Sequence, residues 1–209
     1  MPLGLTLSKG LEDLLGHAAD SAQISSLLSY LELLTKWNSS YNLTAIRDPQ
    51  EMITRHLLDS LSVLPWMGEG ELLDAGTGAG LPGLPLAIMR PQMTVTLLDS
   101  TGKKIRFLRH VKRQLALKNI YPVQARLESW QPESAPASII SRAFSSLADF
   151  CSASRHLLQH ETRLLAMKGK YPKSELEDLP AWVKVDSVEK LSVPGLQEER
   201  HLVIMSVRI

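Results

Sequence analysis

The sequence predicts an α/β fold in which a mostly parallel sheet of seven strands is covered by helices and preceded by a helical extension. From residue 70 onward, apolar and β-branched runs of strand length alternate with segments of helical periodicity, which is typical of a parallel sheet with helices on both faces. A glycine-rich turn at residues 76–83 joins the first run to the first helical segment. The last two runs, 182–191 and 201–208, lack a helical segment between them, which predicts an antiparallel hairpin at one edge.

Residues 1–67 contain helical patterns and no strand pattern. Apolar residues recur at helical spacing over residues 24–34 and form one stripe that needs a partner surface. A further helix is expected to begin at Asp48, a good N-cap residue, and to stop at Pro65. We therefore expect residues 1–67 to form a helical extension packed on a core domain of residues 68–209.

The core region is predicted to alternate strands with three principal helices. The strands are expected at residues 71–75, 94–98, 120–125, 138–142, 163–168, 182–191 and 201–208, and the helices at residues 82–90, 102–117 and 146–158. Ligands of such sheets bind at the carboxyl ends of the strands. The loops after residues 75, 99, 126 and 141 are therefore expected to surround the functional site.

The composition is that of an ordinary globular chain. Its 209 residues are 44% hydrophobic and 22% charged, which suits one sizeable α/β domain with an extension. The first 20 residues lack a signal-peptide pattern and no apolar segment reaches membrane-spanning length, so we expect a cytoplasmic protein without a membrane partner. The formal net charge of +1 gives no overall signal for nucleic acid. A single cysteine, Cys151, and six histidines without ligand spacing predict no structural metal.

The segment from Asp74 to Gly83, DAGTGAGLPG, is typical of a strand that turns through glycines into a helix. Alternate glycines allow positive φ and close approach of a ligand, and the N–H groups at a helix start favour electron-rich ligand atoms. A P-loop is excluded because the segment lacks the Gly-Lys-Ser/Thr ending. The dinucleotide pattern fits poorly because Leu81 stands where a small residue is needed. The spacing instead resembles motif I of Rossmann-like S-adenosylmethionine-dependent methyltransferases.

A carboxylate follows the second predicted strand. Asp99 ends this strand about 20 residues after the turn, where ribose hydroxyls bind in such folds. Its side chain could accept both ribose hydroxyl protons, or it could simply cap the next helix. Because NAD enzymes and methyltransferases share this acid, it indicates a ribose without choosing between them.

Two other loops offer further cofactor contacts. Backbone groups from Gly76 through Gly78 to Leu81 are expected to lie against the methionine part of S-adenosylmethionine. Leu127 and Glu128, after the third predicted strand, fall where an adenine ring would pack and where its edge would be recognised. The predicted cofactor site therefore spans the first three strand ends.

The loop after the fourth predicted strand lacks two motifs that would identify the atom that accepts the methyl group. It carries neither the Asp/Asn-Pro-Pro-Tyr/Phe motif of exocyclic amine methylation nor the Pro-Cys nucleophile of pyrimidine C5 methylation. Cys151 is expected to be a small buried residue in a helix. A ring nitrogen with a free lone pair, such as guanine N7, needs no catalytic acid, base or nucleophile. Arg142 is the candidate for orienting the guanine or the cofactor carboxylate, with a surface salt bridge as the alternative.

Basic residues cluster on the second predicted helix of the core. Lys103, Arg106, His110 and Arg113 follow helical spacing along one face. This ridge could hold RNA phosphates in a salt-dependent way, or it could be an ordinary solvated face. Lys168, after the fifth predicted strand, is a further candidate for RNA binding.

Several blocks of the sequence together resemble one family. They are Lys36-Trp37-Asn38 with Tyr41-Asn42-Leu43-Thr44, Arg55-His56-Leu57-Leu58-Asp59-Ser60, the glycine-rich segment, Leu98-Asp99-Ser100 and Ile140-Ser141-Arg142-Ala143. The chain closely resembles the RsmG (GidB) family of bacterial ribosomal RNA methyltransferases over about residues 25–205.

The resemblance implies an activity and a partner. The activity would be transfer of a methyl group from S-adenosylmethionine to N7 of a guanine in the decoding-region loop of 16S rRNA, within the 30S subunit or its precursor and without a DNA partner. The cofactor contacts that the resemblance implies are Gly76, Leu81, Leu127, Glu128 and Arg142. Two other interpretations remain open from the residues alone: a small-molecule or protein methyltransferase, and a nucleotide-binding module without catalysis.

Overall fold

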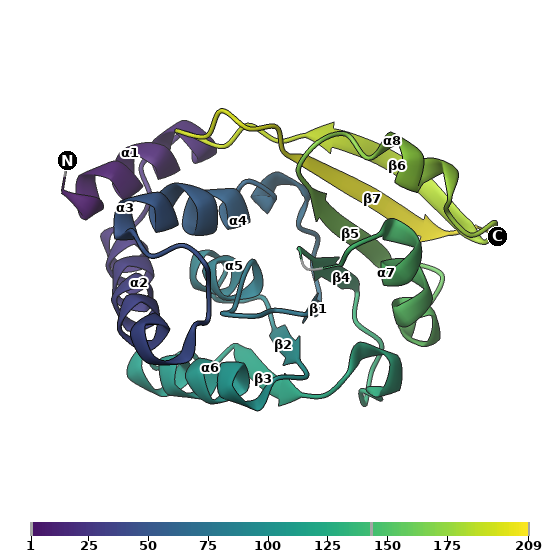
Figure 1. Cartoon of the computed structure of the whole chain (residues 1–209), viewed down its shortest axis with the longest axis horizontal. Helices are drawn as coiled ribbons and strands as arrows, with labels where there is room; N and C mark the ends of the chain where they lie inside the picture. The colour runs from purple at the N-terminus through teal and green to yellow at the C-terminus, as the bar shows by residue number, and fades with distance from the viewer. Residues whose placement is uncertain (1, 143, 209) are drawn as a thin grey trace.

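The computed structural model describes residues 2–142 and 144–208, with a seven-stranded sheet at its centre (Figure 1). The strands are β1 (Leu72–Ala75), β2 (Val95–Asp99), β3 (Ile120–Gln124), β4 (Ser138–Ser141), β5 (Arg163–Lys168), β6 (Val183–Lys190) and β7 (His201–Val207). Their order is β3-β2-β1-β4-β5-β7-β6; β7 runs antiparallel to both of its neighbours, β5 and β6, and the other neighbouring strands pair parallel. The predicted parallel sheet with an antiparallel edge hairpin is confirmed. The strand order reverses between β1 and β4, where ligands of open α/β sheets bind.

Two hydrophobic clusters cover the two faces of the sheet. The helices are α1 (Leu3–Leu15), α2 (Ser21–Tyr41), α3 (Pro49–Met52), α4 (Asp59–Leu61), α5 (Gly83–Met89), α6 (Gly102–Gln114), α7 (Leu147–Ser154) and α8 (Lys173–Glu177). Side chains of α1 to α6 join one cluster, and those of α7 and α8 join the other. Successive residues of β1 alternate between them: Leu72 belongs to the first and Leu73 to the second.

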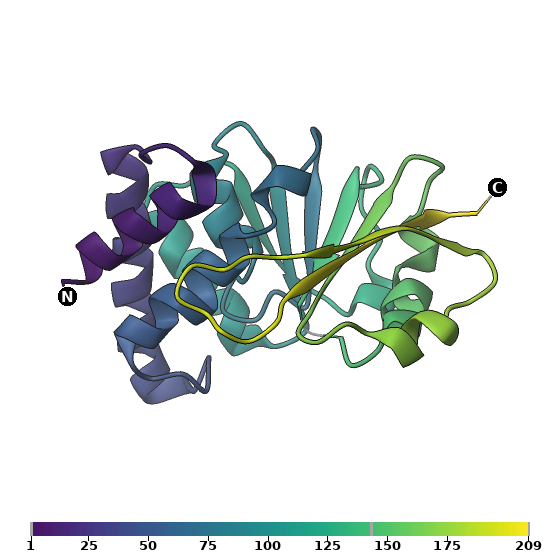
Figure 2. The same ribbon diagram turned by 90° about the horizontal axis from the view of Figure 1, so that it is seen from above.

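The N-terminal helices share their core with the sheet domain. Buried leucines of α1 and α2 lie in the same cluster as residues of α5, α6 and β2. Figure 2 shows α1 and α2 gathered at one end of the molecule, with α7 and α8 at the other. The apolar stripe predicted over residues 24–34 therefore finds its partner surface on the helices of the sheet domain.

The third N-terminal helix is less regular than its sequence pattern predicts. It begins as expected at Asp48, whose side chain accepts a hydrogen bond from the backbone N–H of Gln50 at 3.0 Å. It then passes through a π-helical turn at Ile53–Leu58 into α4, and ends at Leu61. The expectation that Pro65 stops this helix is wrong, because the helix ends earlier and Pro65 lies inside a separate 3₁₀ turn, Leu64–Trp66. A π turn within a helix frequently marks a functional site.

Other differences from the predicted elements concern helix ends. The helix expected at 102–117 ends at Gln114, and Ala116 takes a positive φ of 51° just beyond it. The helix expected at 146–158 divides into α7 and a 3₁₀ turn at Arg155–Leu157. The short helix α8 and a 3₁₀ turn at Leu127–Ser129 were not predicted, because segments this short carry little periodicity. Within residues 2–142 and 144–208, no helix is long and apolar enough to cross a membrane.

Candidate active site

The glycine-rich turn is built around a buried carboxylate. Oδ2 of Asp74 accepts hydrogen bonds from Oγ1 of Thr77 at 2.6 Å and from the backbone N–H of Gly83 at 2.8 Å. Asp74 is fully buried, and this burial raises the pKa of its carboxyl from 3.8 to about 6. Asp74 thus joins the end of β1 to the start of α5 and shapes the turn from below, without facing the ligand space.

Two glycines of the turn serve different purposes. Gly78 has a φ of 61°, and a Cβ added there would meet only the carbonyl oxygen of Gly76, at 4.0 Å. A Cβ on Gly80, with a φ of 101°, would lie 2.8 Å from Leu108 and 3.0 Å from Leu84. Gly80 is therefore required for packing, whereas Gly78 leaves open space above the turn that a ligand can use.

Asp99 lies at the carboxyl end of β2 and faces the turn. Its Oδ2 accepts hydrogen bonds from the backbone N–H of Gly78 at 3.0 Å and from Nζ of Lys104 at 3.1 Å. Its Oδ1 accepts one from the backbone N–H of Thr101 at 2.8 Å. The N-cap of α6 is Thr101, so the alternative role of Asp99 as the helix cap is not what the structure shows.

Two adjoining hollows bring the predicted cofactor residues together. The first, of about 260 Å³, is lined by Gly76, Leu98, Asp99, Ser100, Thr101, Lys104, Ala125, Arg126, Leu127, Glu128 and Phe144. The second, of about 220 Å³, is lined by Leu43, Thr44, His56, Gly76, Thr77, Gly78, Ala79, Leu81, Lys104 and Arg142. The hollows share Gly76 and Lys104, so the loops after β1, β2, β3 and β4 line two adjoining hollows at the carboxyl ends of these strands.

A third hollow, of about 400 Å³, continues from the second. It shares His56 and Arg142 with the second, and is lined in full by Ile46, Arg55, His56, Asp59, Arg142, Met167, Lys168, Gly169 and Arg200. Four of these side chains are cationic and one is a carboxylate. Glu198 and Glu175, outside this lining, pair with Arg55 and Lys168. The unmatched positive charge therefore belongs to Arg142 and Arg200, which share Asp59.

Asp59 clamps two arginines in this third hollow. The side chain of Asp59 is 4% exposed; Nη1 of Arg142 donates to its Oδ2 at 3.0 Å, and Nε of Arg200 donates to its Oδ1 at 2.9 Å. Nη1 of Arg142 also donates to the backbone carbonyl of Arg55 at 3.2 Å. Because its carboxylate partner is buried, the Arg142 pair is more than the exposed salt bridge considered from sequence, and the guanidinium is held in place. Ala143, which follows Arg142, lies outside the described residues.

His56 is uncharged where it lines the two hollows. Its Nδ1 donates to the backbone carbonyl of Arg55 at 3.1 Å, which leaves Nε2 to accept from Oγ1 of Thr44 at 2.8 Å. Burial, and then the charge of Arg142, lowers the pKa of His56 from 6.5 to about 4. The imidazole is therefore neutral at pH 7.

The comparison with known sequences decides the family. Residues 23–203 match the family GidB, described as rRNA small subunit methyltransferase G. The chain belongs to this family. The ribosomal RNA small subunit methyltransferase G of Pseudomonas aeruginosa (strain LESB58) is 52% identical over 200 residues, which are 95% of this chain and 93% of that protein. The protein of the same name from Stutzerimonas stutzeri (strain A1501) is 55% identical over 193 residues, 91% of this chain and 90% of that protein.

Solved structures agree on the fold. A SAM-dependent methyltransferase from Aquifex aeolicus superposes with a TM-score of 0.57 at 20% identity, over 76% of this chain and 93% of that one. TrmN from Thermus thermophilus superposes with a TM-score of 0.57 at 16% identity, over 75% of this chain and 53% of that one. By family the chain is a methyltransferase, and its fold is the Rossmann-like fold of these solved methyltransferases.

Side chains of α2 hold loops that line the hollows. The hydroxyl of Tyr30, fully buried on α2, donates to the backbone carbonyl of Ala79 in the glycine-rich turn at 2.9 Å. Oδ1 of Asn38 accepts from the backbone N–H of Thr44 at 2.9 Å, and its Nδ2 donates to the carbonyl of Ile46 at 3.2 Å. Thr44 and Ile46 line the second and third hollows, so α2 shapes both of them.

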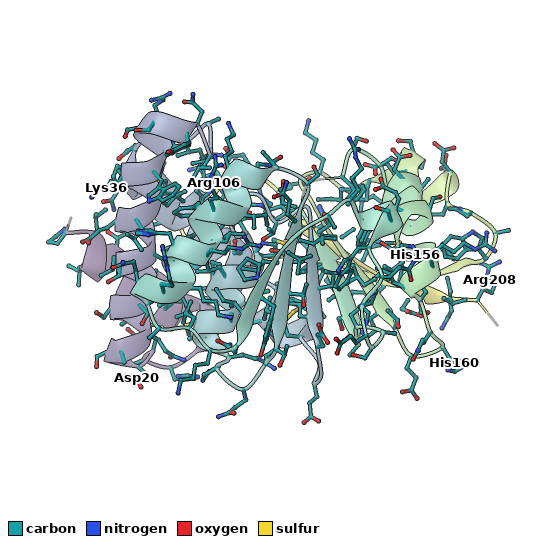
Figure 3. The ribbon with its side chains drawn as sticks, turned by 90° about the horizontal axis from the view of Figure 1, so that it is seen from below. Asp20, Lys36, Arg106, His156, His160 and Arg208 are labelled. Carbon is teal, nitrogen blue, oxygen red and sulfur yellow. The ribbon has the colours of Figure 1, made fainter. Side chains whose placement is uncertain are left out.

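The predicted basic ridge is divided by the structure. Nζ of Lys103 donates to the backbone carbonyl of Tyr41 at 2.8 Å, and the ring centroids of His110 and Trp37 are 5.3 Å apart. Both side chains therefore pack against α2. Arg106 is exposed on α6; Figure 3 labels it at the end of the molecule that carries α2. Lys103 and His110 therefore contact α2 and are not part of a freely solvated helix face, which was one interpretation of the spacing.

Lys168 and Cys151 both have structural partners. Nζ of Lys168 lies 2.7 Å from Oε2 of Glu175, and the lysine side chain is only 12% exposed. Cys151 is buried in α7 with its Sγ 3.8 Å from Sδ of Met205, and burial raises the pKa of its thiol to about 12. The prediction that Cys151 is a small buried residue in a helix is confirmed, whereas the sequence analysis gives no role to Asp59 or Arg200. Asp59 had a weak signal, since it is the one charged residue in the otherwise uncharged segment 57–64.

Proposed function

We propose that this chain transfers a methyl group from S-adenosylmethionine to N7 of a guanine in the decoding-region loop of 16S rRNA. The observation that carries the proposal is the positively charged hollow around Arg142 and Arg200, which shares His56 and Arg142 with the hollow above the glycine-rich turn. Arginine guanidinium groups suit phosphate oxygens and the O6/N7 edge of guanine. The names of the relatives, ribosomal RNA small subunit methyltransferase G, support the same substrate class.

The residues of the first two hollows fit the cofactor. Asp99 offers carboxylate oxygens for ribose hydroxyls, and Leu127 with Glu128 offers an apolar surface and polar atoms for the adenine. Gly76, Gly78 and Leu81 line the second hollow, where the methionine part would lie. The open space over Gly78 supports this placement, because any side chain there would occupy it. These six positions and Arg142 are the proposed cofactor contacts.

The chemistry requires placement more than proton transfer. S-adenosylmethionine supplies an electrophilic methyl carbon bound to a sulfonium sulfur. The N7 lone pair forms a bond to this carbon while the carbon–sulfur bond breaks and its electron pair stays on sulfur. The guanine gains the positive charge that the sulfur loses, and no proton has to leave N7. In-line positioning of the two reactants can by itself supply a large part of the rate enhancement of such a methyl transfer.

The groups around the reaction space are consistent with this chemistry. His56 is neutral and already hydrogen-bonded at both ring nitrogens. Cys151 is buried in α7 and lines none of the three hollows. We propose that Arg142, held by Asp59, orients the guanine or the cofactor carboxylate, and that no residue acts as acid, base or nucleophile.

We further propose that residues 68–209 form the S-adenosylmethionine-dependent methyltransferase domain, which carries the proposed cofactor and RNA contacts, and that residues 1–67 form a helical extension packed on it. Arg106, exposed on α6, and Lys103, anchored beside it to α2, are the proposed phosphate contacts on one side of the site. Lys168 would contribute charge to the wall of the basic hollow rather than a mobile contact, because Glu175 already holds its ammonium group.

The test is transfer of labelled methyl from S-adenosylmethionine to 30S subunits that lack the modification. The RNA is digested to nucleosides, and the labelled product is identified by mass spectrometry, with naked 16S rRNA and ribosomal proteins measured in parallel. Label in 7-methylguanosine is the expected result. Label in another nucleoside or in protein, from an enzyme shown to bind the cofactor, would contradict the proposal.

A further inference from the structure

An exposed aromatic side chain stands beyond the basic hollow. Tyr171 follows β5 in the loop before α8, and 53% of its surface is exposed. Lys170 and Lys173, on either side of it, are exposed as well. A large exposed aromatic residue between two lysines is the composition of a single-stranded nucleic-acid contact, in which rings stack on bases and cations meet phosphates.

The tyrosine ring has a rigid support. It meets the ring of His201 edge-on, with centroids 5.7 Å apart and planes 86° apart. His201 is itself buried, and its Nδ1 lies 2.8 Å from the backbone carbonyl of Gly169. Pro172, the next residue, is also buried. The ring is therefore held against β7 and its neighbouring loop while half of it stays open to a ligand.

The loop also lines a further hollow, which adjoins the basic hollow around Arg142. A fourth hollow, of about 630 Å³, is lined by Lys168, Gly169, Lys170, Tyr171, Pro172, Lys173, Ser174, Glu175 and Glu177. It shares Lys168 and Gly169 with the basic hollow around Arg142. Of its two carboxylates, Glu175 is neutralised by Lys168, so that Lys170 and Lys173 outnumber the remaining Glu177. An RNA strand whose target base enters the basic hollow would next meet this surface.

We infer that Tyr171 is a stacking platform for a base that neighbours the methylated nucleotide, with Lys170 and Lys173 beside its phosphates; this inference rests on the proposed function. A base in an RNA loop has to lose its stacking partners before it can enter a protein pocket, and aromatic side chains commonly replace them. Stacking is tolerant of base identity, so Tyr171 would hold the strand in place and leave the choice of guanine to the basic hollow.

The experiment compares three variants in methyl transfer to unmethylated 30S subunits. Tyr171→Ala removes the ring, and Tyr171→Trp keeps an aromatic surface. Tyr121→Ala is the matched control, because Tyr121 is 49% exposed and has Nζ of Lys112 4.6 Å above its ring, yet it lies on β3 and lines none of the four hollows. The KM for 30S subunits, the affinity for S-adenosylmethionine and ultraviolet crosslinking of residue 171 to 16S rRNA are measured for each.

Tyr171→Ala is expected to raise the KM for 30S subunits by roughly 5- to 100-fold and to lose the crosslink, with cofactor affinity unchanged. Tyr171→Trp should stay within about threefold of the wild type, as should Tyr121→Ala. An unchanged KM in Tyr171→Ala, an equal loss in Tyr121→Ala, or no rescue by Tyr171→Trp would overturn the inference while the wild-type activity still stands. If the wild-type protein itself transfers no methyl to 16S rRNA, the proposed function fails first.

Discussion

Asp74→Asn tests the account of the glycine-rich turn through the pH dependence of stability. In the native protein Oδ2 of Asp74 accepts from Thr77 and Gly83, while its Oδ1 has no hydrogen-bond partner among the described residues. Asn has nearly the same shape, so its oxygen can keep both hydrogen bonds and its NH₂ group takes the place of Oδ1. The substitution therefore removes the ionisation of the side chain with little change in packing.

The expected magnitude follows from the raised pKa. Burial raises the pKa of Asp74 from 3.8 to about 6, and a difference of two in pKa corresponds to about 3 kcal/mol. The folded state binds this proton more tightly than the unfolded state does. The stabilisation is thus fully present below about pH 4 and is lost as the pH rises through 6. Relative to Asp74→Asn, the wild type should lose up to about 3 kcal/mol of unfolding free energy between pH 4 and pH 7.

The assay is urea unfolding of both proteins at pH 4, 5, 6 and 7, compared as a difference at each pH. His56 works in the opposite direction, because its lowered pKa of about 4 costs stability as the pH falls below 6.5. His56 is present in both proteins, so its contribution cancels in the difference. A difference that stays constant from pH 4 to pH 7, or one that grows in favour of the wild type, would refute the reasoning about Asp74.

Three further predictions concern the site itself. Gly78→Arg should abolish S-adenosylmethionine binding, measured by calorimetry, because the new side chain fills the space above the turn. Gly16→Arg, at another positive-φ glycine with open space around it, is the control and should bind the cofactor normally. Normal binding by Gly78→Arg would show that the cofactor does not bind above the turn. Tyr30→Phe should lower the unfolding free energy by about 1 kcal/mol and weaken cofactor binding several-fold, and equal cofactor affinity would mean that α2 does not hold the turn. Replacing Lys103 and Arg106 by Ala should weaken RNA binding and reduce its salt slope by about 2 at unchanged cofactor affinity; an unchanged slope would make this face an ordinary solvated surface.

The parts of the fold that the sequence predicts well are those with a local cause. The strand pattern, the turn and the placement of Asp99 each depend on residues that are close together in the chain. The edge hairpin of β6 and β7 is predictable for the same reason, since no helical segment separates the two runs. Hydrophobic periodicity and glycine spacing report on such features directly.

The clamp on Arg142 has no such local cause. Asp59 is 83 residues from Arg142 and 141 residues from Arg200, and the three meet only when the start of α4, the loop after β4 and the loop before β7 converge. Periodicity says nothing about which distant cation a buried carboxylate will bind. The same limit explains why Lys168 resembles a free basic residue in the sequence, although Glu175 pairs with it across the loop before α8.

The measurement that bears most directly on the central claim is the position of the methyl group within 16S rRNA. RNA from unmethylated 30S subunits, treated with this enzyme and S-adenosylmethionine, is reduced with borohydride and cleaved with aniline, which breaks the chain at 7-methylguanosine. The cleavage sites are then mapped by primer extension, with the Gly78→Arg protein as the control. The account predicts one new cleavage at a guanine in the decoding-region loop. Cleavage elsewhere in 16S rRNA, or none although methyl has been transferred, would contradict it.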